Sequence, residues 1–61
     1  MELNIEKIQK ELNRLNQSKR WLAVKIGVDR QLVDYWFTSK TIKAADRIAQ
    51  VLGYEPKDLI L

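Results

Sequence analysis

The chain of 61 residues contains neither cysteine nor histidine. Disulfide bonds and the common zinc sites are therefore excluded, together with nucleophile–base pairs that depend on these side chains. The carboxylates are scattered, and there is no phosphate-binding loop of the kind that nucleotide enzymes use. We accordingly expect no enzymatic activity, no metal and no cofactor. A chain without cysteine also suits a reducing cytoplasm.

Long apolar runs are absent as well. No segment approaches the length needed to span a bilayer, so we expect neither a membrane association nor a signal peptide. Hydrophobic residues still make up 46% of the chain, and their regular spacing excludes a disordered polypeptide. We expect one small domain over residues 1–61. At this length there is no room for a separate ligand-sensing or dimerisation domain, so no small-molecule ligand is expected.

The charge is unevenly distributed along the chain. The net charge is +3, yet the window from Arg14 to Lys43 holds seven basic and two acidic residues and so carries +5, leaving −2 for the remainder. A surface with clustered positive charge attracts a polyanion such as a nucleic acid. A solvated lysine surface without a partner would have the same composition.

Apolar spacing and helix-end residues indicate an all-α fold, with no strand signal. The expected helices are five short ones, at about residues 4–15, 19–26, 30–37, 42–52 and 57–60. Ser18, Asp29 and Thr41 are expected to cap helices at their amino ends, and Gly27 and Gly53 to end them. The inward positions are Ile5, Ile8, Leu12, Leu15, Leu22, Ala23, Ile26, Val33, Trp36, Ala45, Ile48, Ala49, Leu52 and Leu59.

The second and third expected helices meet with almost no linker between them. Ala23 is small enough for the two helices to approach closely, Gly27 supplies a left-handed turn, and Val33 fills the angle between them. This spacing is typical of a helix-turn-helix, whose second helix can enter the major groove of DNA.

Two blocks of the chain carry a wider resemblance. S-K-R-W-L-A-V-K-I-G-V-D-R-Q-L-V-D-Y-W and I-A-Q-V-L-G-Y-E-P-K-D-L-I, in this order, resemble the phage repressor and Cro family of helix-turn-helix regulators, also called the XRE type. The resemblance implies a compact, lambda repressor-like bundle of five helices. It also implies binding to a near-palindromic operator in double-stranded DNA, commonly as a homodimer, in the cytoplasm of a bacterium or as a phage-encoded protein.

The resemblance further assigns site residues. The base-reading positions are Arg30, Gln31, Asp34 and Tyr35. The resemblance places Lys19 and Lys40 at phosphate-contact positions. Arg20, Thr41 and Lys43 are further candidates for phosphate contacts, chosen for their side chains and their places near the motif. Arginine can bind guanine and glutamine adenine through paired hydrogen bonds. Asp34 has two interpretations, since it can accept a hydrogen bond from cytosine or simply pair with Arg30. Ser39 stands where the family usually has glycine, which implies a strained or differently built turn.

The aromatic residues and the carboxyl-terminal end leave alternatives open. Trp36 shares a face with Val33 and is expected in the core. Trp21 and Phe37 are harder to bury, so they either mark an interface or cover the edge of a small core, the latter being favoured for Trp21. A homodimer contact is expected at an apolar end made of Tyr54, Leu59, Ile60 and Leu61.

Two functions are therefore expected in order of preference. The first is a small Cro-like or repressor-like regulator of a phage or mobile element that acts by occupying an operator. The alternative is a protein-interaction module or antitoxin-like partner with the same fold and little or no DNA binding. The basic cluster with Arg30 and Gln31 favours the first, and the aromatic residues favour the second.

Overall fold

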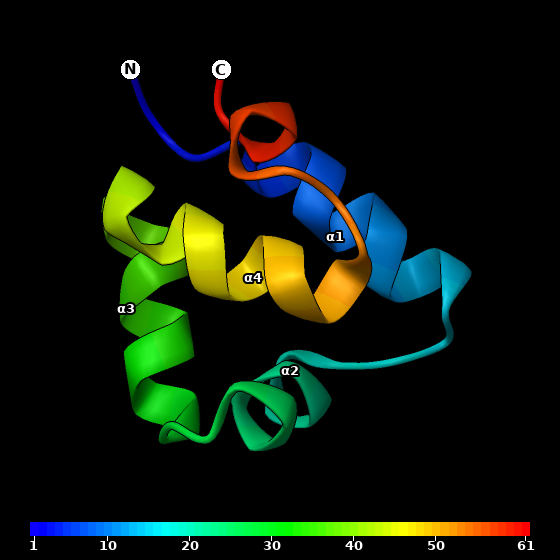
Figure 1. The fold of residues 1–61 in the computed structure, drawn as a ribbon. Coiled ribbons are helices and arrows are strands. Elements are labelled where there is room, and N and C mark those ends of the chain that lie inside the picture. Colours follow the sequence, from blue (N-terminus) through cyan, green and yellow to red (C-terminus); the bar gives the residue numbers. More distant parts are fainter.

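Four α-helices and two short 3-10 segments make up the chain in the computed structural model, which describes residues 1–61. The elements are α1 (Ile5–Arg14), α2 (Lys19–Ile26), α3 (Arg30–Ser39), η1 (Ile42–Ala44), α4 (Ala45–Leu52) and η2 (Pro56–Leu59). In Figure 1, α4 crosses the centre, with α2 below it, α3 at one end, and α1 and η2 above. The all-α fold is thus confirmed. None of the helices combines the length and the apolar character needed to cross a bilayer.

α1 is amphipathic, as its apolar spacing predicts. The Asn4 side chain caps it by accepting a hydrogen bond from the Lys7 amide at 3.1 Å, and Ile8 and Leu12 are buried. The prediction that Leu15 faces inward is wrong, because Leu15 is exposed. The helix ends at Arg14, and the chain then turns through Asn16, whose φ of 58° is positive. Leu15 itself keeps a helical backbone, and its amide donates to the Glu11 carbonyl, so its exposure comes from its place at the end of α1 and not from a change of direction before it.

α2 has the expected bounds and the expected caps. The Ser18 hydroxyl accepts from the Trp21 amide at 3.3 Å. At the other end Gly27 has a φ of 90°, and the amides of Gly27 and Val28 both donate to the carbonyl of Ala23. A side chain at this φ would be strained, which explains why glycine suits the position.

α3 begins and ends differently from the prediction. Asp29 occupies the capping position, but its side chain makes no capping hydrogen bond, contrary to the expectation. The helix continues two residues beyond Phe37 to Ser39, and Lys40 ends it in the left-handed conformation with a φ of 55°. A strained turn was expected at Ser39, but Ser39 is still helical. The left-handed residue is Lys40, one position later, where the backbone conformation favours glycine.

The chain after α3 is also tighter than predicted. Residues Ile42–Ala44 form the 3-10 segment η1, so α4 starts only at Ala45, and the Thr41 side chain does not cap it. Gly53 ends α4 with a φ of 81° as expected. The expected fifth helix is the 3-10 segment η2, with Pro56 in its first position.

All elements share one core of thirteen buried residues. They are Leu3, Ile8, Leu12, Leu22, Ala23, Val33, Trp36, Phe37, Ala44, Ala45, Ile48, Ala49 and Leu59. Ile5, Ile26 and Leu52, which were expected inside, are only partly buried against it. Phe37 is buried, so the idea that it is exposed at an interface is wrong. Adjacent residues of a helix diverge by about 100°, so the burial of both Trp36 and Phe37 shows that the core covers a broad side of α3.

The two ends of the chain lie side by side (Figure 1). Leu3 and Ile60 form a single antiparallel bridge, in which the Asn4 amide donates to Leu59 and the Leu61 amide donates to Glu2. The sequence gives no sign of this pairing, because one bridge has no periodicity. It seals Leu3 and Leu59 into the core.

A polar cluster ties α1 to the segment before η2. The Tyr54 hydroxyl donates to one carboxylate oxygen of Glu11, and Arg14 Nε donates to the other at 2.7 Å. The Lys7 ammonium lies over the Tyr54 ring, 5.0 Å from its centre. The hydrogen bond from Tyr54, followed by that from Arg14, lowers the pKa of Glu11. The hydrogen bond to Glu11, followed by partial desolvation, raises the pKa of Tyr54.

The shifted pKa values predict how stability depends on pH. The contribution of Glu11 is complete above the ordinary pKa of 4.5 and is lost as pH falls through its lower folded-state pKa. The contribution of Tyr54 is complete below the ordinary pKa of 10.0 and is lost as pH rises through its higher folded-state pKa. Tyr54→Phe should therefore lower Tm near neutral pH, and the difference from the wild type should shrink towards both extremes. Thermal unfolding followed by circular dichroism measures this. Tyr35→Phe is the control, because Tyr35 is exposed; equal effects of the two variants would contradict the prediction.

A second prediction concerns the left-handed residue at the end of α3. Lys40→Gly should raise the free energy of unfolding by about 0.5–1 kcal/mol, because glycine adopts this conformation without strain from a Cβ atom. Lys40→Ala removes the same charge but keeps the Cβ atom, so it should bring no such gain. Denaturant titration of both variants measures the difference. Equal stabilities of the glycine and alanine variants would show that the backbone at Lys40 is not strained.

Candidate nucleic-acid interface

The amino ends of α2 and α3 border one open hollow on the surface. Five side chains line it, and none is hydrophobic: Ser18, Lys19, Arg20, Arg30 and Asp34. Both helix ends also carry the partial positive charge of their free amides. The hollow is therefore an electropositive surface with a single carboxylate in it.

That carboxylate is held between two basic groups. Asp34 Oδ1 lies 3.8 Å from Lys19 Nζ, and Asp34 Oδ2 lies 3.9 Å from Arg30 Nε. Of the two interpretations of Asp34, the pairing with Arg30 is present, with Lys19 as a second partner. The Lys19 ammonium also lies over the Phe37 ring, 5.0 Å from its centre. Lys19 thus connects the start of α2 to the core side of α3.

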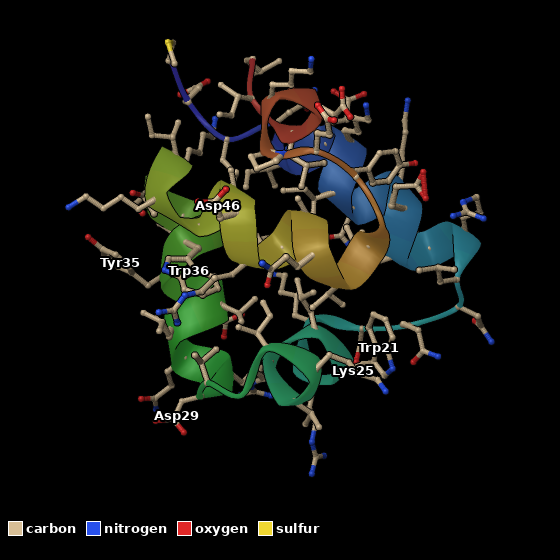
Figure 2. All side chains as sticks on the ribbon, in the orientation of Figure 1. Trp21, Lys25, Asp29, Tyr35, Trp36 and Asp46 are labelled. Atoms are coloured by element: carbon tan, nitrogen blue, oxygen red, sulfur yellow. The ribbon has the colours of Figure 1, made fainter.

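The side of α3 that faces away from the core is exposed to solvent. Arg30 and Gln31 are exposed in its first turn, and Tyr35 follows with 61% of its surface exposed. Figure 2 shows the Tyr35 side chain pointing away from the molecule. Six hydrogen bonds involve side chains, and none of them is made by Arg30, Gln31 or Tyr35. Gln31 and Tyr35 thus have no polar partner within the chain, and Arg30 has only the Asp34 carboxylate.

The other candidate residues surround α3 at its two ends. Arg20 is exposed at the start of α2, and Lys43 is exposed in η1; neither takes part in an ion pair. Lys40 lies 4.0 Å from the Glu2 carboxylate, which offsets part of its charge. Thr41 is half-buried. The structure therefore brings Lys19, Arg20 and Arg30 together, while Lys40 and Lys43 lie apart from them beyond the carboxyl end of α3.

One exposed residue of α3, Leu32, was not among the candidate site residues predicted from the sequence. Leu32 is 38% exposed and is not part of the core cluster, although its neighbour Val33 is fully buried. It stands three residues before Tyr35, so the two side chains are neighbours on the helix surface. That spacing was available in the sequence, but an apolar residue beside a core position is ordinarily assigned to the core.

The expected dimer surface at the carboxyl-terminal end is much reduced. Leu59 is fully buried in the core, so its assignment to a dimer contact is wrong. Tyr54 and Ile60 pack partly against the same core, and Tyr54 is held by Glu11. Only Leu61, which is 67% exposed, presents most of its side chain to solvent. The apolar residues here mainly complete the fold of one chain.

Trp21 lies on the outward side of α2. It is partly buried against the core, as expected for a residue that covers its edge, and the Lys25 ammonium is 6.0 Å from the centre of its ring (Figure 2). Val24, on the same side of α2, is 72% exposed. This second surface is apolar with a basic neighbour, and it is separate from the exposed side of α3.

Comparison of the chain with models of protein families, with curated proteins and with solved structures found no match.

Proposed function

We propose that this chain is a sequence-specific regulator of transcription that binds double-stranded DNA through a helix-turn-helix formed by α2 and α3. The observation that carries the proposal is the division of α3 into two sides. Val33, Trp36 and Phe37 fix one side in the core. Arg30, Gln31 and Tyr35 extend from the other without internal hydrogen bonds. A rigid helix with such a side fits the width of the major groove.

The chemistry of the first turn suits the edges of base pairs. The Arg30 guanidinium can donate two parallel hydrogen bonds to guanine O6 and N7, and the Gln31 amide can bind adenine N6 and N7. Adjacent residues of a helix diverge by about 100°, so the two side chains would address neighbouring base pairs or one base and the backbone. Tyr35 lies about one turn further along α3.

The carboxylate of Asp34 has a positioning role in this proposal. It is already paired with Lys19 and Arg30, so it is a poor acceptor for cytosine. Instead it holds the arginine side chain near the groove and keeps a lysine beside it. Ordering a flexible side chain in advance reduces the entropy lost on binding.

Basic side chains around α3 would contact the phosphates on both sides of the groove. Arg20 and Lys43 are exposed and unpaired, whereas Lys19 and Lys40 have internal carboxylate partners that phosphate would have to displace. Such contacts give affinity and salt dependence without reading the sequence. The resemblance to phage repressors and Cro proteins supports the same function, with steric blocking of an operator as the mechanism. A near-palindromic operator would require two chains. Of the carboxyl-terminal residues expected to form a dimer contact, Leu61 is the one whose side chain is mostly exposed.

A second candidate function rests on the outward side of α2. Trp21 and Val24, with Lys25 beside them, would suit a protein partner with apolar and acidic groups, as in a protein-interaction module or an antitoxin-like protein. The two functions use different surfaces, so substitutions on α3 and α2 separate them.

Binding to DNA can be tested with a pool of random duplexes. We expect selection of a defined site whose binding constant falls with salt, with a logarithmic slope of about −3 to −4 per chain if four phosphates are neutralised. Arg30→Ala combined with Gln31→Ala should weaken binding to that site at least about thirtyfold, because two paired contacts are lost. Fluorescence anisotropy measures both effects.

The matched control is Gln9→Ala combined with Lys10→Ala. It removes a glutamine and a basic side chain from adjacent positions of α1, and so makes the same change in net charge. It should leave binding to the selected site within about twofold, as a change in distant charge is largely screened. An α3 double variant that folds and binds the site like the wild type would overturn the assignment of α3. If no duplex in the pool binds the chain, the protein-interaction function is favoured.

The role of Asp34 gives a further prediction. Asp34→Asn removes a negative charge from the hollow and releases Lys19 and Arg30, so binding to unrelated duplexes should strengthen. Binding to the selected site should gain less, because Arg30 is no longer held in place, and the ratio of specific to non-specific affinity should fall. Glu6→Gln makes the same charge change on the outer side of α1, where its ion-pair partner is Lys10. If both variants changed the ratio equally, Asp34 would have no positioning role.

A further inference from the structure

The exposed part of α3 has two chemically different edges. At 100° per residue, Arg30 and Asp34 lie along the edge that faces Lys19 and the hollow. Leu32 lies on the opposite edge, next to the ring of Tyr35. The first edge carries charge, and the second is apolar over both of its side chains, which are 38% and 61% exposed.

The apolar edge needs a partner with a matching group. A single exposed leucine on a protein surface requires no explanation. Here, however, Leu32 and Tyr35 lie to one side of Gln31 around the helix, and Arg30 and Asp34 lie to its other side. A partner that covers the exposed side of α3 therefore meets both the apolar and the charged edge. The basic edge favours a polyanion over an apolar protein surface. In the major groove of a duplex, the exposed apolar group is the C5 methyl of thymine.

We propose that Leu32, together with the ring of Tyr35, is a specificity-determining contact for a thymine methyl group. The inference rests on the proposed function and adds to it the base that this edge of α3 recognises. Arg30 and Gln31 would select purines by hydrogen bonds, and Leu32 would select an A·T pair by burying the methyl group. The selected site should therefore contain a thymine next to the purines read by the first turn.

The proposal can be tested by changing the DNA and leaving the protein intact. In the duplex selected from the random pool, each thymine is replaced in turn by deoxyuridine, which lacks only the methyl group. For the wild-type chain we expect Kd to rise about threefold to fivefold at one or two positions, the effect of one buried methyl group. Replacement elsewhere in the duplex should have no effect.

The same replacements with variants of the protein identify the contact. Leu32→Ala should bind the thymine and uracil duplexes equally at one of the sensitive positions, whereas Leu32→Met should keep the preference for thymine. Tyr35→Phe should also keep it, because only the hydroxyl is lost. Val24→Ala is the matched control: it shortens another exposed apolar side chain, on α2, and should leave the preference unchanged. Circular dichroism establishes that each variant is folded.

The outcomes separate this inference from the proposed function. If the wild-type chain binds a selected duplex in a salt-dependent way but does not distinguish thymine from uracil at any position, the methyl contact is wrong and DNA binding stands. Retention of the thymine preference by folded Leu32→Ala would overturn the assignment to Leu32. If no duplex binds, both proposals fail, and the apolar edge is then better explained as a contact with protein.

Discussion

The orientation of α3 depends on the three-residue connection that joins it to α2. Gly27 adopts a φ of 90° there, and the amides of Gly27 and Val28 share the Ala23 carbonyl. Helices of eight and ten residues are too short to be stable alone in water, so their packing must hold them. The burial of Ala23 and Val33 brings the two helices together. A larger residue in place of either would change the angle at which α3 is presented.

Electrostatic and packing contacts reinforce each other on the same junction. Lys19 reaches from α2 to the Asp34 carboxylate and to the ring of Phe37, which itself belongs to the core. The ion pairs of Asp34 are partly exposed, so each adds little to stability. They nevertheless bring the Asp34 carboxylate to within 3.8 Å of Lys19 and 3.9 Å of Arg30 at the edge of the hollow. The groups proposed to bind DNA are thus arranged before DNA arrives.

Local patterns predicted the helices well and the contacts between distant segments poorly. The bounds of α2, and the ends of α2 and α4 at glycine, follow from spacing and turn chemistry. The inward position of Leu59 was expected from the sequence, although the same residue was also assigned to a dimer contact. The burial of Phe37 depends on segments that meet only in the folded chain, and local spacing left it undecided between an interface and the edge of the core. For the candidate site, the exposure of Arg30, Gln31 and Tyr35 follows from helix geometry. The position of Lys19 over a ring and beside Asp34 does not, because it requires the angle between two helices.

The segment at the amino-terminal end of the chain holds the carboxyl end of α3 in place. The bridge between the two chain ends therefore supports the proposed interface. The Leu3 amide donates to the Lys40 carbonyl at 3.0 Å, and Leu3 is itself paired with Ile60. α3 is therefore anchored at one end by the glycine turn and at the other by the amino-terminal segment. A helix held at both ends loses little conformational freedom when it enters a groove. In a domain with so small a core, this double anchoring is a physical route to a rigid surface on α3.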